Sequence, residues 1–157
     1  MIKKITSTDD FNKYRVELLL SVNDFLKSFK QEIRIKVSDV FNKKILKEFG
    51  DNHFCLLIDI DNEESLKING FCVLSIDDFD VFAVKSCLVW AIYVKPYIPS
   101  KVFDEFLLKA EEFAKENDCT AIKMESYRNP KVFSKKVKKF GYIPFRYIQY
   151  FEKQLEA

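Results

Sequence analysis

The chain has 157 residues, and 48% of them are hydrophobic, which is enough to bury the core of one domain. Its formal net charge of +2 is too small to draw the whole molecule strongly to nucleic acid or to a membrane. No stretch approaches the roughly 18–20 apolar residues of a membrane span, and the first residues lack the apolar segment of a signal peptide. We therefore expect a cytoplasmic protein. Its many Lys, Ile, Asn and Phe residues suggest a bacterial or phage source, and a phage protein would be a virion component.

The cysteines do not form a metal-binding pattern. Cys55, Cys72, Cys87 and Cys119 are far apart in the sequence, and His53 is the only histidine. A zinc site usually needs paired Cys or His ligands at short spacing. We expect no metal, and we expect the cysteines to be small buried residues with free thiols.

The N-terminal half is predicted to contain strands and helices in alternation. Residues 2–5 suggest a short strand, and apolar residues at a spacing of three to four predict a helix over 9–29. Residues 31–37 are either an extended connection or a link between helices, and a second helix is expected over 39–49. Strands are expected at 53–60 and 68–76, with a bulge at Asn69-Gly70.

The central segment, 88–124, has the pattern of a strand, a turn, a helix and a strand. Residues 88–94 form a continuous apolar run, which predicts a strand buried on both faces. Two prolines in the turn 95–99 end it, and Ser100 is expected to cap the next helix. The predicted buried face of this helix consists of Phe103, Phe106, Leu107, Ala110, Phe113 and Ala114. Because a helix joins them, the strands 88–94 and 120–124 are expected to be parallel.

The C-terminal part is predicted to form one more helix and one or two strands. The helix is expected over 131–140, and the strands over 143–152. The element order is then β-α-α-β-β-β-α-β-α-β, with room for one further strand. This order predicts a single mixed α/β (α+β) domain over 1–157, with a central mixed sheet and about four helices.

The segment from Val94-Lys95-Pro96 through the helix around residues 106–116 resembles the cofactor-binding core of the GNAT superfamily, the acetyl-CoA-dependent N-acetyltransferases. In that family, a Gln/Arg-x-x-Gly-x-Gly/Ala turn holds the CoA pyrophosphate on backbone N–H groups at the helix N-terminus. The resemblance implies a GNAT-like fold along nearly the whole chain. It also implies acetyl-CoA as the cofactor of any active form.

The residues that carry the function in that family are changed here. Pro99 stands at the Arg/Gln position, Val102 at the first Gly and Asp104 at the second. A branched side chain and a carboxylate both oppose a pyrophosphate at such a turn. The family's general-acid Tyr falls on Val137, which cannot transfer a proton, whereas Asn129 matches the family's cofactor-contacting Asn.

The resemblance also suggests which residues would act if the chain were active. Glu125, at the end of a strand, is the candidate general base, and Tyr93 is a second catalytic candidate. Ordinary strand-end and core positions are alternative interpretations of these two residues. The candidate cofactor contacts are Val94, Lys95, Ser100, Lys101 and Asn129.

Three functions remain open. The losses favour a non-catalytic GNAT-fold module with a protein partner or self-association, such as a structural component of a phage or another assembly. An alternative is an active acyl-CoA N-acyltransferase with an unusual phosphate turn. A second alternative is anion or nucleic-acid binding by the last helix, through lysines at positions Lys131, Lys135, Lys136, Lys138 and Lys139.

Overall fold

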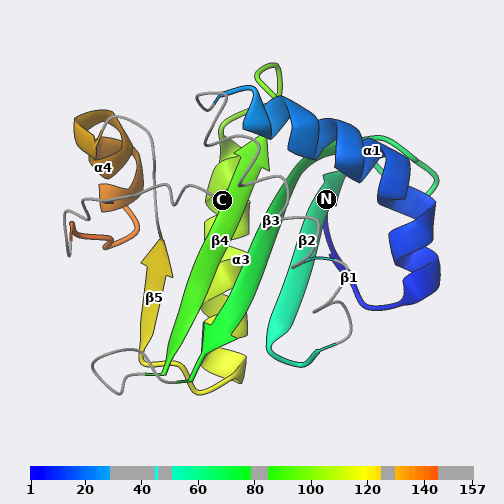
Figure 1. Cartoon of the computed structure of the whole chain (residues 1–157). Coiled ribbons are helices and arrows are strands. Elements are labelled where there is room, and N and C mark those ends of the chain that lie inside the picture. Colours follow the sequence, from blue (N-terminus) through cyan, green and yellow to red (C-terminus); the bar gives the residue numbers. More distant parts are fainter. Residues whose placement is uncertain (29–44, 46–50, 79–84, 125–129, 145–157) are drawn as a thin grey trace, which may run out of the picture. The chain divides into compact units, whose positions relative to one another are not determined.

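The computed structural model describes residues 1–28, 45, 51–78, 85–124 and 130–144 (Figure 1). The chain divides into two compact units, Met1–Glu125 and Ser126–Ala157. The single domain expected from the sequence stays a prediction, and the two units are described separately below.

The first unit is built on a five-stranded mixed sheet in the order β1-β2-β3-β4-β5. The strands are β1 (Ile2–Ile5), β2 (Phe54–Ile60), β3 (Ile68–Asp77), β4 (Ser86–Val94) and β5 (Ala121–Met124). The first four pair antiparallel, and β4 pairs with β5 in parallel. This confirms the predicted mixed sheet and the parallel crossover.

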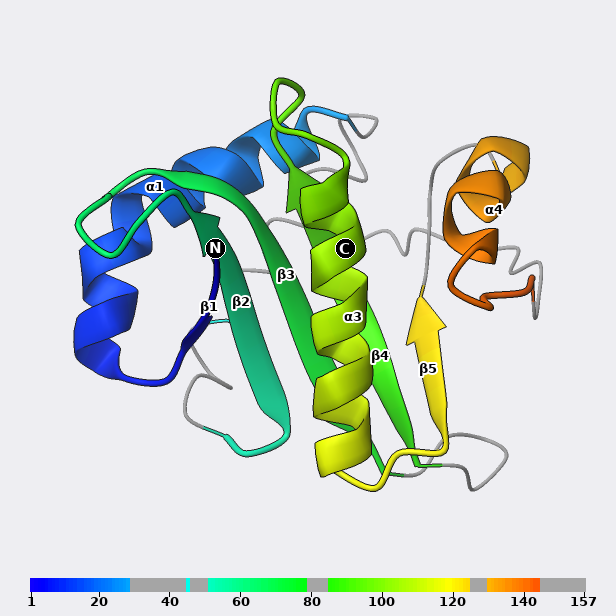
Figure 2. The same cartoon turned by 180° about the vertical axis from the view of Figure 1, so that it is seen from behind.

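Helices α1 (Thr8–Leu26) and α3 (Lys101–Glu116) cover opposite faces of the sheet (Figures 1 and 2). The Ser7 side chain accepts a hydrogen bond from the Asp10 N–H at 3.1 Å, which caps the start of α1. On α3, all six residues of the predicted apolar face are buried, and Val102 is buried with them. The 3.6-residue period therefore identified the packed face of α3 correctly.

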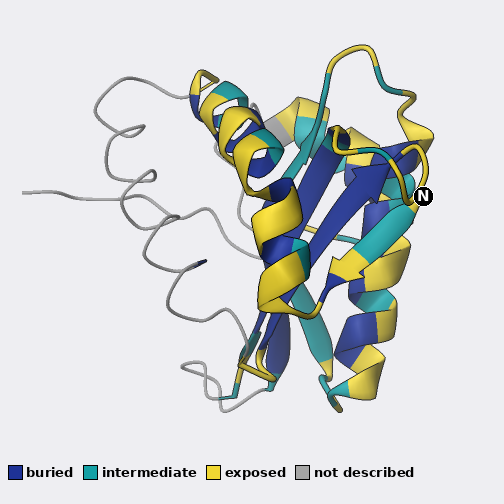
Figure 3. Cartoon of the chain, turned by 90° about the vertical axis from the view of Figure 1, so that its right-hand side faces the viewer, coloured by how far each residue is buried: buried dark blue, intermediate teal, exposed yellow. Residues whose placement is uncertain are grey.

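The core has two layers, one on each side of the sheet. Alternate residues of β2, such as Leu56 and Ile58, pack under α1, whereas Cys55 and Leu57 pack under α3. Every residue of β2 is buried, and Figure 3 shows this buried centre of the sheet in dark blue. A strand covered on both faces reads as a continuous apolar run, as 54–58 does here.

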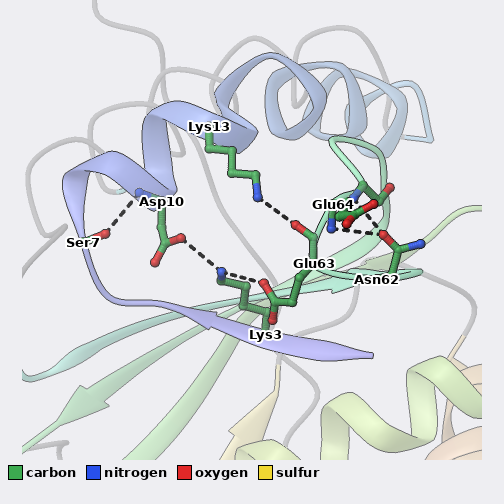
Figure 4. A network of polar contacts seen from close by, with 8 residues as sticks. Lys3, Ser7, Asp10, Lys13, Asn62, Glu63 and Glu64 are labelled. Atoms are coloured by element: carbon green, nitrogen blue, oxygen red, sulfur yellow. Dashed lines mark hydrogen bonds and ion pairs between the residues drawn. The ribbon is translucent and has the colours of Figure 1, made fainter.

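Polar contacts tie the start of α1 to the β2–β3 turn (Figure 4). Lys3 Nζ lies 3.1 Å from both Asp10 Oδ1 and Glu63 Oε2. Lys13 Nζ donates to the Glu63 backbone oxygen at 2.8 Å. Together these contacts connect the start of α1, β1 and the β2–β3 turn at one corner of the unit.

Strand β4 departs from its prediction. Cys87, Val89 and Ala91 are buried, but other residues are only partly buried, so the strand is not sealed on both faces along its length; these are Leu88, Trp90, Ile92, Tyr93 and Val94. The bulge expected at Asn69-Gly70 is confirmed, since the β2–β3 register passes from the Asp59 and Gly70 pair to the Ile60 and Ile68 pair.

Several predicted segments lie outside the described residues. These are the connection 31–37, most of the helix 39–49, the loop 79–84 and the last strands from residue 145. Within that helix, Ile45 is described, and it is helical and buried in the core under α1.

The second unit contains helix α4 (Pro130–Lys138). Gly141, with φ of 80°, follows the helix, and this left-handed conformation suits glycine. Val137 is buried, whereas the lysines of α4 are exposed.

Candidate functional site

Among the described residues, β5 pairs with the first part of β4 only. The parallel ladder joins Ser86–Val89 to Ala121–Met124 and goes no further among the described residues. At the same point, the β3–β4 register skips Trp90, so β4 carries a bulge there. A bulge turns the strand and can end its pairing. The second half of β4 therefore has no described strand beside it on the β5 side.

The turn from β4 to α3 follows this part of the strand, and its N–H groups are largely occupied. The N–H of Val102 donates to Pro99 O at 3.1 Å, and the N–H of Phe103 donates to Ser100 O at 3.1 Å. Pro99 has no N–H. Between Pro99 and Asp104, only the N–H groups of Ser100 and Lys101 lack an acceptor in the described part of the chain. An anion at this helix start would therefore find two backbone donors instead of the usual four.

Ser100 does not cap α3 as the sequence predicts. Its φ and ψ are −59° and −20°, and its side chain makes no capping hydrogen bond. A capping side chain needs an extended backbone at this position. Because the turn already winds as a helix at Ser100, the predicted cap is wrong, although Ser100 does occupy the N-cap position.

The residues that the resemblance aligns with the two family glycines, Val102 and Asp104, both carry side chains at the start of α3. Val102 is 6% exposed and packs into the core under α3. Asp104 lies in the first turn of α3, where a carboxylate stabilises the helix dipole but repels an anion. Val102 is therefore part of the core as well as an obstacle at the turn.

A hollow of about 270 Å³ adjoins the turn and is rich in carboxylates. Its lining includes three carboxylates, those of Asp59, Asp61 and Glu105. It also includes two cations, the Met1 amino group and Lys101. The Met1 amino group is engaged, at 2.7 Å from Asp59 Oδ1. This side of the turn is therefore unfavourable for a pyrophosphate.

A second hollow, of about 300 Å³, lies between α1 and the end of β4. It is lined by Glu17, Leu20, Asn23, Asp24, Lys27, Tyr93, Lys95, Pro96 and Tyr97. Both of its lysines are paired: Lys95 Nζ lies 3.3 Å from Glu17 Oε2 across the hollow, and Lys27 pairs with Asp24 on α1 itself. The hollow is thus close to neutral, with two tyrosines at its wall.

The structure separates the predicted site residues onto different surfaces. Tyr93 packs on the α1 side of the sheet against Phe25 and Phe71, whereas Val94 packs on the α3 side. Burial, and secondarily the Asp24 carboxylate, raise the pKa of the Tyr93 phenol, which keeps it protonated. Lys95 is held by Glu17, away from the exposed Ser100 and Lys101.

Two predicted residues, Glu125 and Asn129, lie outside the described residues, so their roles stay predictions. Val137, at the general-acid position, is buried in the second unit. His53 is more than half exposed and lies 3.6 Å from Asp78 through Nδ1, an ordinary surface contact.

The cysteines are free thiols, as expected. Burial raises the pKa of Cys55 to about 11 and that of Cys87 to about 12. Thiols with such values remain protonated at neutral pH, which makes them poor nucleophiles and poor metal ligands. The described residues contain no group of three or more Cys, His, Asp or Glu side chains placed to hold a metal ion.

Sequence reasoning missed the carboxylates of both hollows. Asp59 and Glu105 meet only because the end of β2 lies near the start of α3, and Glu17 and Asp24 come from the helix that crosses β4. The one available signal was that Asp59 interrupts an otherwise apolar strand; its side chain is 3% exposed.

None of the helices that the structure describes has the length and apolarity needed to span a bilayer.

No protein-family model and no curated protein matches the chain by sequence. Solved structures do match it by shape. A putative acetyl transferase from Pyrococcus furiosus has a TM-score of 0.70 and 19% identity, covering 99% of this chain and 100% of that one. The aminoglycoside 6′-N-acetyltransferase AAC(6′)-IG from Acinetobacter haemolyticus has a TM-score of 0.68 and 14% identity, covering 99% of both chains.

A transcriptional regulator from Bacillus halodurans is also similar, with a TM-score of 0.69 and 13% identity, covering 98% of this chain and all of the other. At sequence identities this low, the likeness to these structures shows the fold of the chain and not its chemistry. The sheet order, the parallel β4–β5 pair and these likenesses agree: the chain has the fold of the GNAT acetyltransferases.

Proposed function

We propose that this GNAT-fold chain does not hold acetyl-CoA at the β4–α3 turn and serves as a non-catalytic interaction module. The observation that carries the proposal is that hydrogen bonds and core packing already occupy that turn. The N–H groups of Val102 and Phe103 donate within the turn, and the Val102 side chain is buried in the core. A pyrophosphate would have to compete with hydrogen bonds and packing that the fold already uses.

The charges beside the turn support the same proposal. Asp104 lies in the first turn of α3, and the hollow beside the turn holds three carboxylates, one of them paired with the Met1 amino group, against one other cation, Lys101. Repulsion between like charges within a few ångströms is strongest where water is partly excluded. Loss of the cofactor site would leave the fold as a scaffold.

An exposed apolar surface supports the interaction role. Val16, Leu20 and Tyr97 are 71%, 54% and 75% exposed, and Leu20 and Tyr97 line the same hollow. Val16 and Leu20 are one helical turn apart and so lie on one side of α1. Exposed apolar groups gathered in this way suit a protein partner or a second copy, as in an assembly.

A specific observation favours a second candidate, an active acyl-CoA N-acyltransferase. The β3–β4 register skips Trp90, so β4 carries a bulge a few residues before the turn into α3. Several similar structures carry the description acetyltransferase. In this case the amides of Ser100 and Lys101 and the Lys101 ammonium would have to hold the phosphates.

Calorimetric titration of the full chain with acetyl-CoA, at low and moderate salt, tests the proposal. We expect no binding at micromolar cofactor, because the turn offers two free amides beside a carboxylate-rich hollow. The matched variants are Lys101→Ala at the turn and Lys115→Ala at the far end of α3, both exposed positions on one helix.

Micromolar binding that Lys101→Ala weakens and Lys115→Ala leaves unchanged would contradict the proposal. The acyltransferase candidate would then take its place, and turnover with small primary amines would be the next measurement.

A further inference from the structure

The second unit carries a concentrated positive charge. The segment 130–144 contains five lysines and no Asp or Glu. With a formal net charge of +2 for the chain, the remaining residues together carry −3, because 2 − 5 = −3. The small net charge of the molecule is therefore the sum of a strongly basic segment, 130–144, and an acidic remainder of the chain.

The lysines of α4 lie on the surface opposite its buried residue. Lys131, Lys135 and Lys138 follow one another at spacings of four and three, which places them in one row along the helix. Val137 is 6% exposed and points the other way, at about 100° per residue. All five lysines, including Lys136 and Lys139, are exposed. We call this row and its two flanking lysines the lysine face.

Helix stability alone does not explain this composition. Lysines in the last turn of α4 favour the helix dipole, and Lys135, Lys136 and Lys138 are placed there. Lys131 lies in the first turn, where a cation is unfavourable and where the helix has no acid. The helix dipole therefore does not account for the lysine in the first turn of α4.

The density of charge indicates the kind of anion. From Lys131 to Lys138 the helix rises about 10 Å and carries four lysines, so there is one charge for about every 3 Å. One strand of duplex nucleic acid carries a charge about every 3.4 Å. An acidic peptide of equal density would need an acid at almost every extended residue.

We propose that the lysine face of α4 binds the phosphate backbone of a nucleic acid without reading its sequence. Lysine supplies a flexible point charge rather than the planar fork with which arginine reads guanine, and α4 contains no arginine. Contacts made only to phosphates position a protein on nucleic acid but do not select bases. The inference is independent of whether acetyl-CoA binds, since it concerns the other unit of the chain.

Fluorescence anisotropy of the full chain with a labelled single-stranded oligonucleotide, from low to physiological salt, tests this inference. We expect a dissociation constant of about 10⁻⁶–10⁻⁴ M and a logarithmic salt slope of about −2 to −3.5, for three to five neutralised phosphates. Oligonucleotides of different sequence should bind alike. The variant Lys135→Glu/Lys138→Glu should bind about tenfold more weakly or worse at low salt, because it removes two contacts and adds two negative charges.

The matched control is Lys67→Glu/Lys115→Glu, which makes the same charge change at two exposed positions of the first unit. It should bind as the parent does. Lys135→Gln/Lys138→Gln gives a milder second variant, and circular dichroism checks that each variant is folded. Equal loss in the control, or no binding by the folded parent at low salt, overturns the inference. Tighter binding to polyglutamate than to the oligonucleotide, or displacement of the oligonucleotide by micromolar acetyl-CoA, also overturns it.

Discussion

Three residues determine the character of the β4–α3 turn. Pro99 removes a backbone donor and lets the helical winding begin before α3, so that its carbonyl receives the Val102 N–H. Val102 directs a branched side chain into the core, and Asp104 supplies the first-turn carboxylate. Each change is individually favourable for the helix and unfavourable for a bound phosphate. On the proposed function, the residues that oppose cofactor binding at this turn also stabilise the fold.

Replacing Val102 by glycine should consequently destabilise the protein rather than restore a phosphate site. The change removes a buried side chain and places glycine within a helix, for an expected loss of about 2–3 kcal/mol in the free energy of unfolding. Urea denaturation followed by circular dichroism measures this loss.

The neighbouring exposed position provides the control. Lys101→Gly changes the same helical turn without emptying the core, and we expect it to cost about 1 kcal/mol or less. Similar losses in the two variants would show that Val102 is not a core residue.

At the scale of the elements, local sequence patterns predicted the features that depend on neighbouring residues alone. The apolar spacing of α3 gave its buried face, and Asn69-Gly70 indicated the β3 bulge. The bulge at Trp90 had no such signal, because it contains neither Gly nor Pro. The partial exposure of β4 residues such as Leu88 and Trp90 depends on which distant elements cover each face of the strand, and its own apolar run does not encode that.

The candidate site was predictable only in part for the same reason. The turn and its departures could be located from Pro99, Val102 and Asp104 in sequence. The hydrogen bonds that occupy its amides, and the carboxylates brought beside it by β2, depend on how distant elements meet. Long-range contacts of this kind leave no periodic signal in one sequence.

Gly70 allows β3, β4 and α3 to approach closely. A Cβ added there would lie 2.4 Å from the Tyr93 backbone oxygen and 3.3 Å from a ring carbon of Phe106. The backbone of β4 cannot yield as a flexible side chain can. Gly70→Ala should therefore lower the free energy of unfolding by about 2 kcal/mol or more, as overpacked sites do. Thermal and urea unfolding measure it.

Gly141→Ala gives the contrasting case. Among the described residues no atom lies within 4 Å of the added Cβ, and the positive φ of 80° opposes the change. The expected cost is about 1–2 kcal/mol from the left-handed conformation, partly offset by the smaller entropy of the unfolded chain. A Gly70 variant as stable as the parent would mean that β3 and β4 are farther apart than described.

At the scale of the first unit as a whole, the sheet and α3 enclose a sealed layer that contains most of the thiols. Cys55, Cys72 and Cys87 lie in this layer at 2%, 0% and 0% exposure, whereas Cys119 lies at its margin and is partly exposed. Burial raises the pKa of each thiol. Each of the three buried thiols must be exposed to solvent and lose its proton before it reacts. Burial in this layer opposes both steps.

Thiol labelling with Ellman's reagent at pH 8 should therefore show two classes. Without denaturant, one thiol should react quickly. The other three should react at least about 10³-fold more slowly, because they wait for an opening that costs about 5 kcal/mol or more. In urea all four should react together. Cys119→Ser should remove the fast phase and leave the slow one unchanged. If the Cys119→Ser variant still contained a fast-reacting thiol, α3 would not seal the sheet. The buried position of Val102 at the cofactor turn would then lose its support as well.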